Sequence, residues 1–204
     1  MKVVSRHVLI EKCPPSWVPI ALDEILESIE EVRWPPNSDS FVIYPESGKK
    51  RGEGNGVRPI KESFVENLLA RGWTPEHPFP LRIENSASQL GAMDAGKVFG
   101  EDGDFGAVEW ETGNISSSHR ALNKLSLGLI KESICLGVLV VPTVELARYL
   151  TDRVGNLREL IPYFHLWSTL ETRKGYLEII AVQQDRESTS VPKIPKGTDG
   201  RNIN

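Results

Sequence analysis

Residues 105–141 read FGAVEWETGNISSSHRALNKLSLGLIKESICLGVLVV, and this segment decides the fold class. Its first seven residues alternate in part between apolar and acidic side chains, which is the period of a β-strand. Leu122, Leu125 and Leu129 then recur at helical spacing and predict a helix over about residues 117–131. Residues 134–141 are continuously apolar, as in a strand buried on both faces in the middle of a sheet. The segment therefore predicts a strand, a helix and a second strand.

Further elements extend this pattern on both sides. Apolar residues at helical spacing predict an acidic amphipathic helix over residues 22–32 and a second helix from Pro59 to a stop at Gly72. Short strands are expected at residues 41–44 and 176–182, and further helices at 144–150 and 157–163. This order favours an α/β protein with a central mixed β-sheet flanked by helices on both sides.

Three segments lack a regular pattern. Residues 47–59 combine four glycines with lysines and arginines and are expected to form a locally basic loop. Residues 73–104 give no clear assignment beyond short extended pieces around 81–83. Residues 185–204 contain prolines and glycines without apolar periodicity, so an extended C-terminal tail is expected. No repeat or linker divides the chain, and we expect one domain over residues 1–204.

Composition narrows the class of protein. The 204 residues are 39% hydrophobic and 25% charged, as in an ordinary globular domain. The formal net charge of −4 argues, taken as an average, against a nucleic-acid partner. With two cysteines, no secretory signal and no apolar run long enough to span a bilayer, the chain is expected in a reducing cytoplasm and away from membranes.

Glu109 and Glu111 are the sharpest local feature. On a strand, their spacing places both carboxylates on one face roughly 7 Å apart. One interpretation is a solvated polar face on a half-buried strand. The other is a divalent-cation site, completed by one of the acids just upstream, as in metal-dependent phosphodiesterases. These upstream acids are Asp94, Glu101, Asp102 and Asp104.

A run of hydrogen-bonding side chains follows the acid pair, over residues 112–120. Either Ser116 or Ser117 could simply cap the next helix. Alternatively, Asn114 and Arg120 present hydrogen-bonding groups to base edges or phosphates.

Four stretches resemble the BamHI family of type II restriction endonucleases. They are VEWETGNISSSHRALNKLSLGL (108–129), YLTDRVGNLRELIPYF (149–164), VPKIPKGTDG (191–200) and NGVRPIKESF (55–64). The resemblance runs from about Trp34 to Gly200 and implies the restriction-endonuclease-like core of the PD-(D/E)XK nucleases. It also implies Mg²⁺-dependent cleavage of double-stranded DNA at the palindrome GGATCC, after the first G, with 5′ overhangs and 5′-phosphate ends.

The resemblance assigns roles to particular residues. Asp94 and Glu109 match the metal-binding acids, and Glu111 matches the glutamate proposed as general base. Glu76 matches a further metal-binding and catalytic glutamate, and Lys61 a catalytic position near the scissile phosphate. The positions that match DNA-binding residues are Asn114, Ser116, Arg120, Asp152 and Arg153 in the major groove and Gly197 in the minor groove.

The same resemblance implies cofactors and partners. Mn²⁺ is expected to substitute for Mg²⁺, and Ca²⁺ to support binding without cleavage. A palindromic site implies a homodimer, with no nucleotide cofactor, in the cytoplasm of a prokaryotic cell. Lys131, His165 and Ser168 differ from the dimer-interface charges of the family. The chain also ends soon after the GTDG segment, from which looser sequence discrimination is expected.

Two other functions stay open from the residues alone. One is a catalytically silent protein that binds the same DNA site. The other, which ignores the resemblance, is a glycosidase that uses the acid pair as its catalytic dyad.

Overall fold

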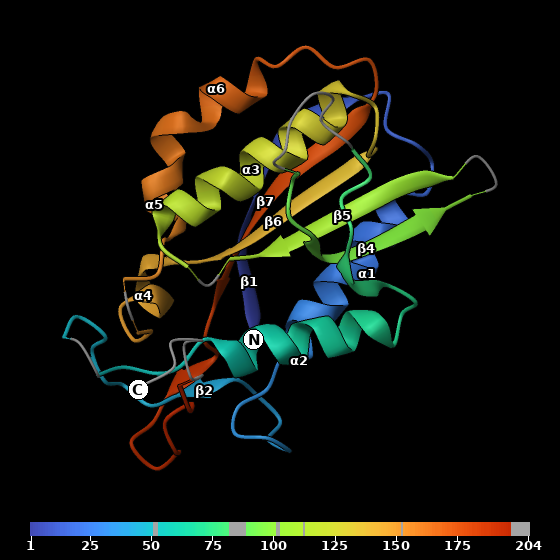
Figure 1. Ribbon diagram of the computed structural model, residues 1–204. Helices are drawn as coiled ribbons and strands as arrows, with labels where there is room; N and C mark the ends of the chain where they lie inside the picture. Colours follow the sequence, from blue (N-terminus) through green and yellow to red (C-terminus); the bar gives the residue numbers. More distant parts are fainter. Residues whose placement is uncertain (51–52, 82–88, 101–102, 112, 152, 197–204) are drawn as a thin grey trace.

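Strands β5 (Asp104–Trp110) and β6 (Leu136–Pro142) lie at the centre of a six-stranded sheet in the computed structural model, which describes residues 1–50, 53–81, 89–100, 103–111, 113–151 and 153–196 (Figure 1). The strand order is β1-β7-β6-β5-β4-β3, with β1 (Lys2–Lys12), β7 (Gly175–Gln183), β4 (Met93–Phe99) and β3 (Thr74–His77). The β7-β6-β5 pairs are parallel and the others antiparallel. The predicted mixed sheet is therefore confirmed.

Helices cover both faces of the sheet, also as predicted (Figure 1). One face packs against α1 (Val18–Glu30) and α2 (Arg58–Leu69), and the other against α3 (Ile115–Ile130) and α6 (Phe164–Ser168). Alternation along the central strands separates the two cores: Val138 and Val140 face α1 and α2, whereas Leu139 and Val141 face α3. The remaining elements are short: α4 (Val144–Ala147), α5 (Leu157–Leu160), η1 (Ile161–Tyr163), and β2 (Val42–Ile43) paired in parallel with β8 (Arg186–Glu187).

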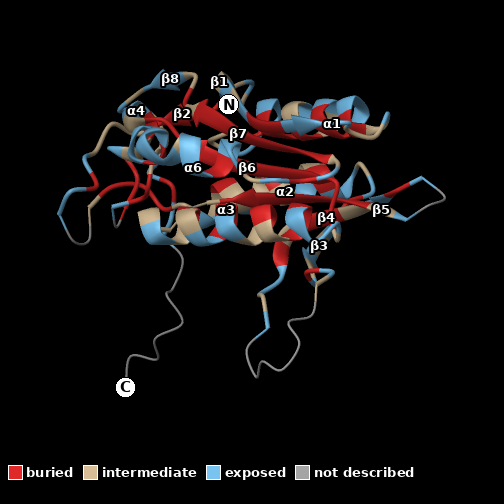
Figure 2. Cartoon of the chain, turned by 90° about the horizontal axis from the view of Figure 1, so that it is seen from above, coloured by how far each residue is buried: buried red, intermediate tan, exposed pale blue. Residues whose placement is uncertain are grey.

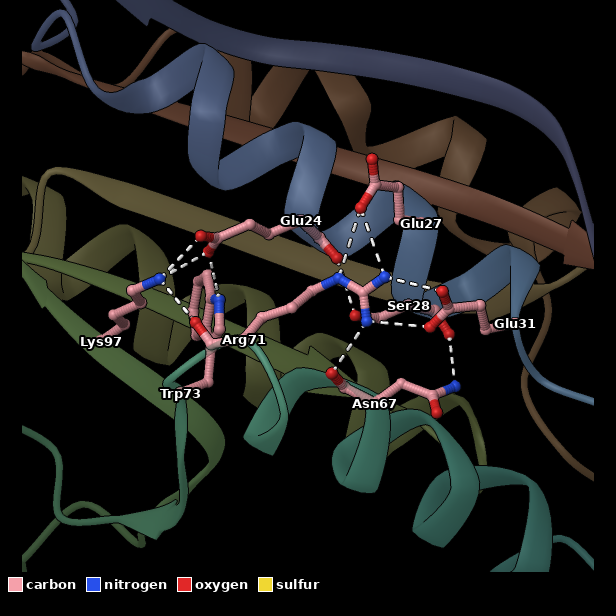
Figure 3. Close-up of polar contacts among 8 residues, drawn as sticks. All are labelled: Glu24, Glu27, Ser28, Glu31, Asn67, Arg71, Trp73 and Lys97. Carbon is pink, nitrogen blue, oxygen red and sulfur yellow. Dashed lines mark hydrogen bonds and ion pairs between the residues drawn. The ribbon is translucent and has the colours of Figure 1, made fainter.

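A polar network fixes α1 to α2 and to β4 (Figure 3). The Glu24 carboxylate accepts hydrogen bonds from the Trp73 indole at 2.8 Å and from Lys97 Nζ at 2.7 Å. Arg71, just beyond α2, forms ion pairs with Glu27 at 3.3 Å and with Glu31 at 2.8 Å. These contacts surround the edge of the core and hold β4 in the position from which Asp94 reaches the sheet centre.

One expectation of the sequence needs correction. Residues 105–110 are buried throughout, so β5 is not a half-buried strand with a solvated face (Figure 2). Within the expected extended C-terminal segment, residues 185–196 are anchored to the rest of the protein, because β8 pairs with β2 and Ile194 is buried. Within the described residues, no helix is long and apolar enough to cross a membrane.

Candidate active site

Asp94 and Lys61 meet where β4 passes α2. The Asp94 carboxylate accepts the Trp110 backbone N–H at 2.7 Å and forms an ion pair with Lys61 Nζ. Burial is the largest single effect and lowers the pKa of Lys61. The charge and hydrogen bond of Asp94, together with the charges of Glu76 and Glu109, outweigh it in sum, so the pKa is raised overall. Lys61 is therefore a cation held by the acids around it.

Glu109 is buried on β5 and faces α3. Its carboxylate forms an ion pair with Lys124, and Lys124 also donates to the Ala92 carbonyl at 2.8 Å. Burial raises the pKa of Glu109, Lys124 opposes the rise, and the charge of Asp94 adds to it. Lys124 thus links the segment before β4 to the acid on β5.

Glu111 lies one residue beyond β5, and its N–H still donates to the Val140 carbonyl at 3.0 Å. Its Oε2 atom is buried and has no hydrogen-bond partner among the described residues. Burial, then the negative charges of Glu109 and Asp94, raise the pKa of Glu111 to about 7. A carboxyl group with such a pKa is suited to accept a proton near neutral pH.

A groove of about 950 Å³ opens beside these acids, between α3 and residues 89–92. Glu109, Glu111 and Lys124 line it together with Ser116 and Arg120 of α3. Asn114 caps α3, because its side-chain oxygen accepts the Ser116 N–H at 3.0 Å. The helix start that was expected to read DNA is therefore next to the acids that were expected to cut it.

Glu76 lies near this centre but on a different groove. It is exposed on β3 in the left-handed backbone region, with φ of 47°, and lines a groove of about 540 Å³ that also contains Lys61. The structure brings Glu76 into the electrostatic surroundings of Lys61, and the β3–β4 register places it across from Asp94, between the pairs Pro75–Ala95 and His77–Met93.

Asp104, offered as a possible completing acid, is not part of the site. It begins β5 at the far end of the strand and pairs with Lys174 at 2.9 Å and with the Trp17 indole at 3.2 Å.

Arg153 is exposed, two residues before Gly155, whose N–H donates to the Gly113 carbonyl at 2.9 Å. Glu101, Asp102, Asp152 and Gly197 lie outside the described residues.

Sequence reasoning missed Lys124. The signal was present, since Ser116, Arg120 and Lys124 follow one another at four-residue spacing and so share one face of α3. What the pattern lacked was the placement of that face against Glu109, which only the packing of α3 on the sheet supplies.

The donor set fits a hard divalent cation. No group of three or more His, Cys, Asp and Glu side chains in metal-binding geometry occurs among the residues that the structure describes. Mg²⁺ is nonetheless commonly bound by one or two carboxylates with phosphate and water completing its shell. Asp94 and Glu109 supply two such carboxylates, and the ammonium groups of Lys61 and Lys124 show that this centre already attracts cations.

Comparison with known proteins identifies the family. The family model described as restriction endonuclease BamHI matches residues 1–201. The chain is 44% identical over 203 residues to type II restriction enzyme OkrAI of Oceanobacter kriegii, covering 100% of both chains. It is 39% identical over 205 residues to type II restriction enzyme BamHI of Bacillus amyloliquefaciens, covering 98% of this chain and 86% of that one.

A solved structure with the same fold is the restriction endonuclease BglII complexed with a DNA 16-mer. The TM-score is 0.61 at 11% identity, over 91% of this chain and 78% of that one. This likeness supports the restriction-endonuclease fold, and restriction endonucleases use divalent metal ions. The chain belongs to the BamHI family and is a type II restriction endonuclease.

Proposed function

We propose that this chain is a Mg²⁺-dependent homodimer that cuts both strands of GGATCC after the first G. The observation that carries the proposal is the placement of Glu109 and Glu111 in a groove that also presents Ser116 and Arg120 of α3, with Asp94 held beside them on the Trp110 N–H. The two relatives, at 44% and 39% identity, bear the names of type II restriction enzymes, and the BglII structure contains DNA.

Each acid has a separate task. Asp94 and Glu109 would hold the divalent cation, which when bound lowers the pKa of water and stabilises charge on a phosphate. Glu111, whose pKa of about 7 keeps it a usable base, orients the attacking water and accepts its proton. Lys61 faces Asp94 and is placed to donate to a phosphate oxygen. Glu76, on the neighbouring groove, is proposed as a supporting metal-site acid.

Recognition uses the opposite wall and the segments that adjoin it. Asn114, Ser116 and Arg120 would contact base edges in the major groove, together with Asp152 and Arg153. Arginine donates to guanine and aspartate accepts from the cytosine amino group, so the last pair suits a G·C base pair. Gly197 is proposed to reach the minor groove. Because the site is a palindrome, a two-fold dimer would supply one active site per strand.

Incubation of a plasmid with a single GGATCC site, with Mg²⁺ or with EDTA, tests this function. We expect linear product only with Mg²⁺, and sequencing of the ends gives the recognition site and the stagger. D94N and E109A should abolish cleavage yet keep binding to GGATCC in Ca²⁺. D104N is the matched control, because Asp104 lies on the same strand but at its far end, paired with Lys174.

Three outcomes would contradict the proposal. Cleavage in EDTA, or cleavage by E109A, would remove the metal role of the acids. Tight binding of GGATCC by the wild-type protein without cutting under Mg²⁺ or Mn²⁺ would instead show a catalytically silent DNA-binding protein.

A further inference from the structure

Asn55 is a fully buried polar residue in the glycine-rich loop before α2, with 0% of its surface exposed. Its amide Nδ2 donates to the Tyr44 carbonyl at 2.8 Å and to the Tyr149 carbonyl at 3.0 Å. Its Oδ1 accepts the Ile194 N–H at 3.1 Å. Because buried polar groups without partners are costly, this arrangement fixes the side chain to three separate segments of the chain.

The backbone around Asn55 also binds two of these three segments, those at Tyr149 and at Ile194. The Asn55 N–H donates to the Tyr149 carbonyl at 2.8 Å, and its carbonyl accepts the Thr151 N–H at 2.9 Å. The next residue, Gly56, donates its N–H to the Ile194 carbonyl at 2.9 Å. One residue and its neighbour therefore hold residues 149–151 on one side and Ile194 on the other.

Both segments lead directly to positions proposed to read DNA. Thr151 precedes Asp152 and Arg153, and the chain is anchored again at Gly155, whose N–H donates to the Gly113 carbonyl at 2.9 Å. Arg153 thus lies between two fixed points, one at Asn55 and one beside the Asn114 cap of α3. On the other side, Ile194 precedes Gly197 by three residues.

The glycines of this loop are explained by the same close approach. A Cβ atom at Gly48 would lie 1.7 Å from the Leu150 carbonyl oxygen, and one at Gly56 would lie 2.0 Å from the Pro195 carbonyl oxygen. Neither residue has room for a side chain, so the loop backbone contacts each segment directly. The glycine-rich motif serves packing between segments here.

We propose that Asn55 is a positioning residue for sequence discrimination, which holds residues 149–151 and Ile194, next to the proposed major-groove and minor-groove positions, in one fixed arrangement. The inference rests on the proposed function. It assigns Asn55 no contact with DNA and no part in the chemistry at Asp94 and Glu109. Loss of its side chain should let both segments move and so reduce the preference for GGATCC over near-cognate sites.

The test compares wild-type protein, N55A and N55D in Ca²⁺, with affinities for GGATCC, for each single-base-pair variant, and for unrelated DNA. We expect N55A to lower the ratio of cognate to one-mismatch affinity by about tenfold, which is within the usual penalty for one base pair. Affinity for unrelated DNA should stay unchanged, since that depends on phosphate contacts. N55D keeps the acceptor for the Ile194 N–H and loses the side-chain donors to the Tyr44 and Tyr149 carbonyls. The Ile194 amide should therefore keep slow exchange, whereas loosening of the segment at Tyr149 should speed exchange at Thr151, whose N–H donates to the Asn55 backbone carbonyl.

G56A and G48A test separately the contact of the loop with residues 194–196 and its contact with residues 149–151. G56A collides with Pro195 and should disturb only the segment at 194–196, whereas G48A collides with Leu150 and should disturb only 149–151. Each should reduce discrimination, at different base pairs. S28A is the control, because Ser28 is equally buried but its hydroxyl, the group that this variant removes, donates within α1 to the Glu24 carbonyl at 2.7 Å.

The outcomes distinguish this inference from the proposed function. If the wild-type protein shows no preference for GGATCC, the proposed function fails. If the wild type discriminates but N55A, G48A and G56A lose only thermal stability, as S28A does, and keep the affinity ratio, Asn55 is merely structural. Should N55A not fold, G48A and G56A decide between these results by the same ratio.

Discussion

The ionisation of Glu111 has a consequence for stability that can be measured without DNA or metal. In the folded protein its pKa is raised from 4.5 to about 7, first by burial and then by Glu109 and Asp94. Between these values the folded state binds more protons than the unfolded state, so the free energy of unfolding falls as pH rises. The shift corresponds to a contribution of about 3 kcal/mol to the free energy of unfolding. This contribution is present at low pH and is fully lost above pH 7.

We therefore expect E111Q to be more stable than the wild type in EDTA at pH 8, by up to about 3 kcal/mol, with the gap closing below pH 5. Urea denaturation at several pH values measures it. E187Q is a control of opposite sign, since a hydrogen bond from Tyr149 lowers the pKa of Glu187 and removal of that carboxylate should destabilise the protein at neutral pH. If the free energy of unfolding depended on pH in the same way in E111Q and in the wild type, the raised pKa of Glu111 would be refuted.

Lys124 gives a second prediction at the level of single residues. Its side chain is 11% exposed and that of Glu109 is 7% exposed, so K124M leaves a buried carboxylate without its cation. Loss of one partner of a buried pair costs about 3–5 kcal/mol. A divalent cation bound at Glu109 should restore much of that loss.

Thermal unfolding with EDTA and with Ca²⁺, in the absence of DNA, tests this expectation. K124M should have the lower melting temperature in EDTA and the larger gain from Ca²⁺. K174M removes a lysine from Asp104, where Lys174 is 41% exposed, and should show neither effect. An equal Ca²⁺ gain in K124M and wild type would mean that Lys124 and the cation do not share Glu109.

At the scale of elements, α3 joins folding to recognition through its N-cap residue. Asn114 caps the helix by accepting the Ser116 N–H, and it is also a proposed base-reading residue. Aspartate caps as well as asparagine but has no amide N–H to donate. N114D should therefore keep wild-type stability and lose affinity for GGATCC, whereas N114A should lose both, with about 1 kcal/mol of stability.

Urea midpoints and Ca²⁺-supported DNA affinities separate these effects in the same pair of variants. Full affinity in N114D would show that the amide does not contact a base. Equal destabilisation of N114D and N114A would show that the Asn114 side-chain oxygen does not stabilise α3 as its N-cap, and would leave the proposed base contact untouched.

The elements also show what local sequence determines. The central strands and α1, α2 and α3 were predictable, since each has a periodic apolar face that packs where it forms. Strand β1 was missed because it is an edge strand, where Val4 and Val8 remain exposed beside charged residues and blur the alternation. Strands β3 and β4 were missed because the pairing of β4 with β5, and of β3 with β4, is set by tertiary contacts and not by their own composition.

The site follows the same division. The acids were found from spacing and resemblance, but the burial of Glu109 depends on β5 having neighbours on both sides and helices on both faces. Lys124 and Asn55 come from segments remote in sequence from the groups they bind. These contacts arise from long-range packing, which no local sequence pattern predicts.

For the whole molecule, the net charge of −4 is compatible with DNA binding because it is unevenly distributed. Asp94, Glu109 and Glu111 concentrate negative charge where a divalent cation is proposed, and α1 carries further acids. Lys61, Lys124 and Arg120 surround the grooves. The average therefore says little about the surface that would face phosphates.

The palindromic site makes the oligomeric state part of the proposed function, and the surface of η1 and α6 offers a place for the second protomer. Ile161, Tyr163 and Leu166 are 48%, 48% and 58% exposed within six residues. We expect the wild-type protein to sediment as a dimer and L166E to weaken dimerisation at least about tenfold, because a charge would be buried in the interface.

Sedimentation velocity over a concentration series measures this change, and plasmid cleavage by L166E should show more nicked intermediate than the wild type, since a monomer offers one active site. V98E is the matched control: Val98 is 57% exposed on β4, remote from η1 and α6 in the chain, and the substitution makes the same change from apolar to acidic. A dimer of unchanged affinity in L166E, with V98E the weakened variant, would move the interface from η1 and α6 to the β4 edge. A palindromic site is cut in both strands only if the active sites of the two protomers face the same DNA duplex. An interface at the β4 edge would therefore orient the two active-site grooves of the dimer differently toward the DNA.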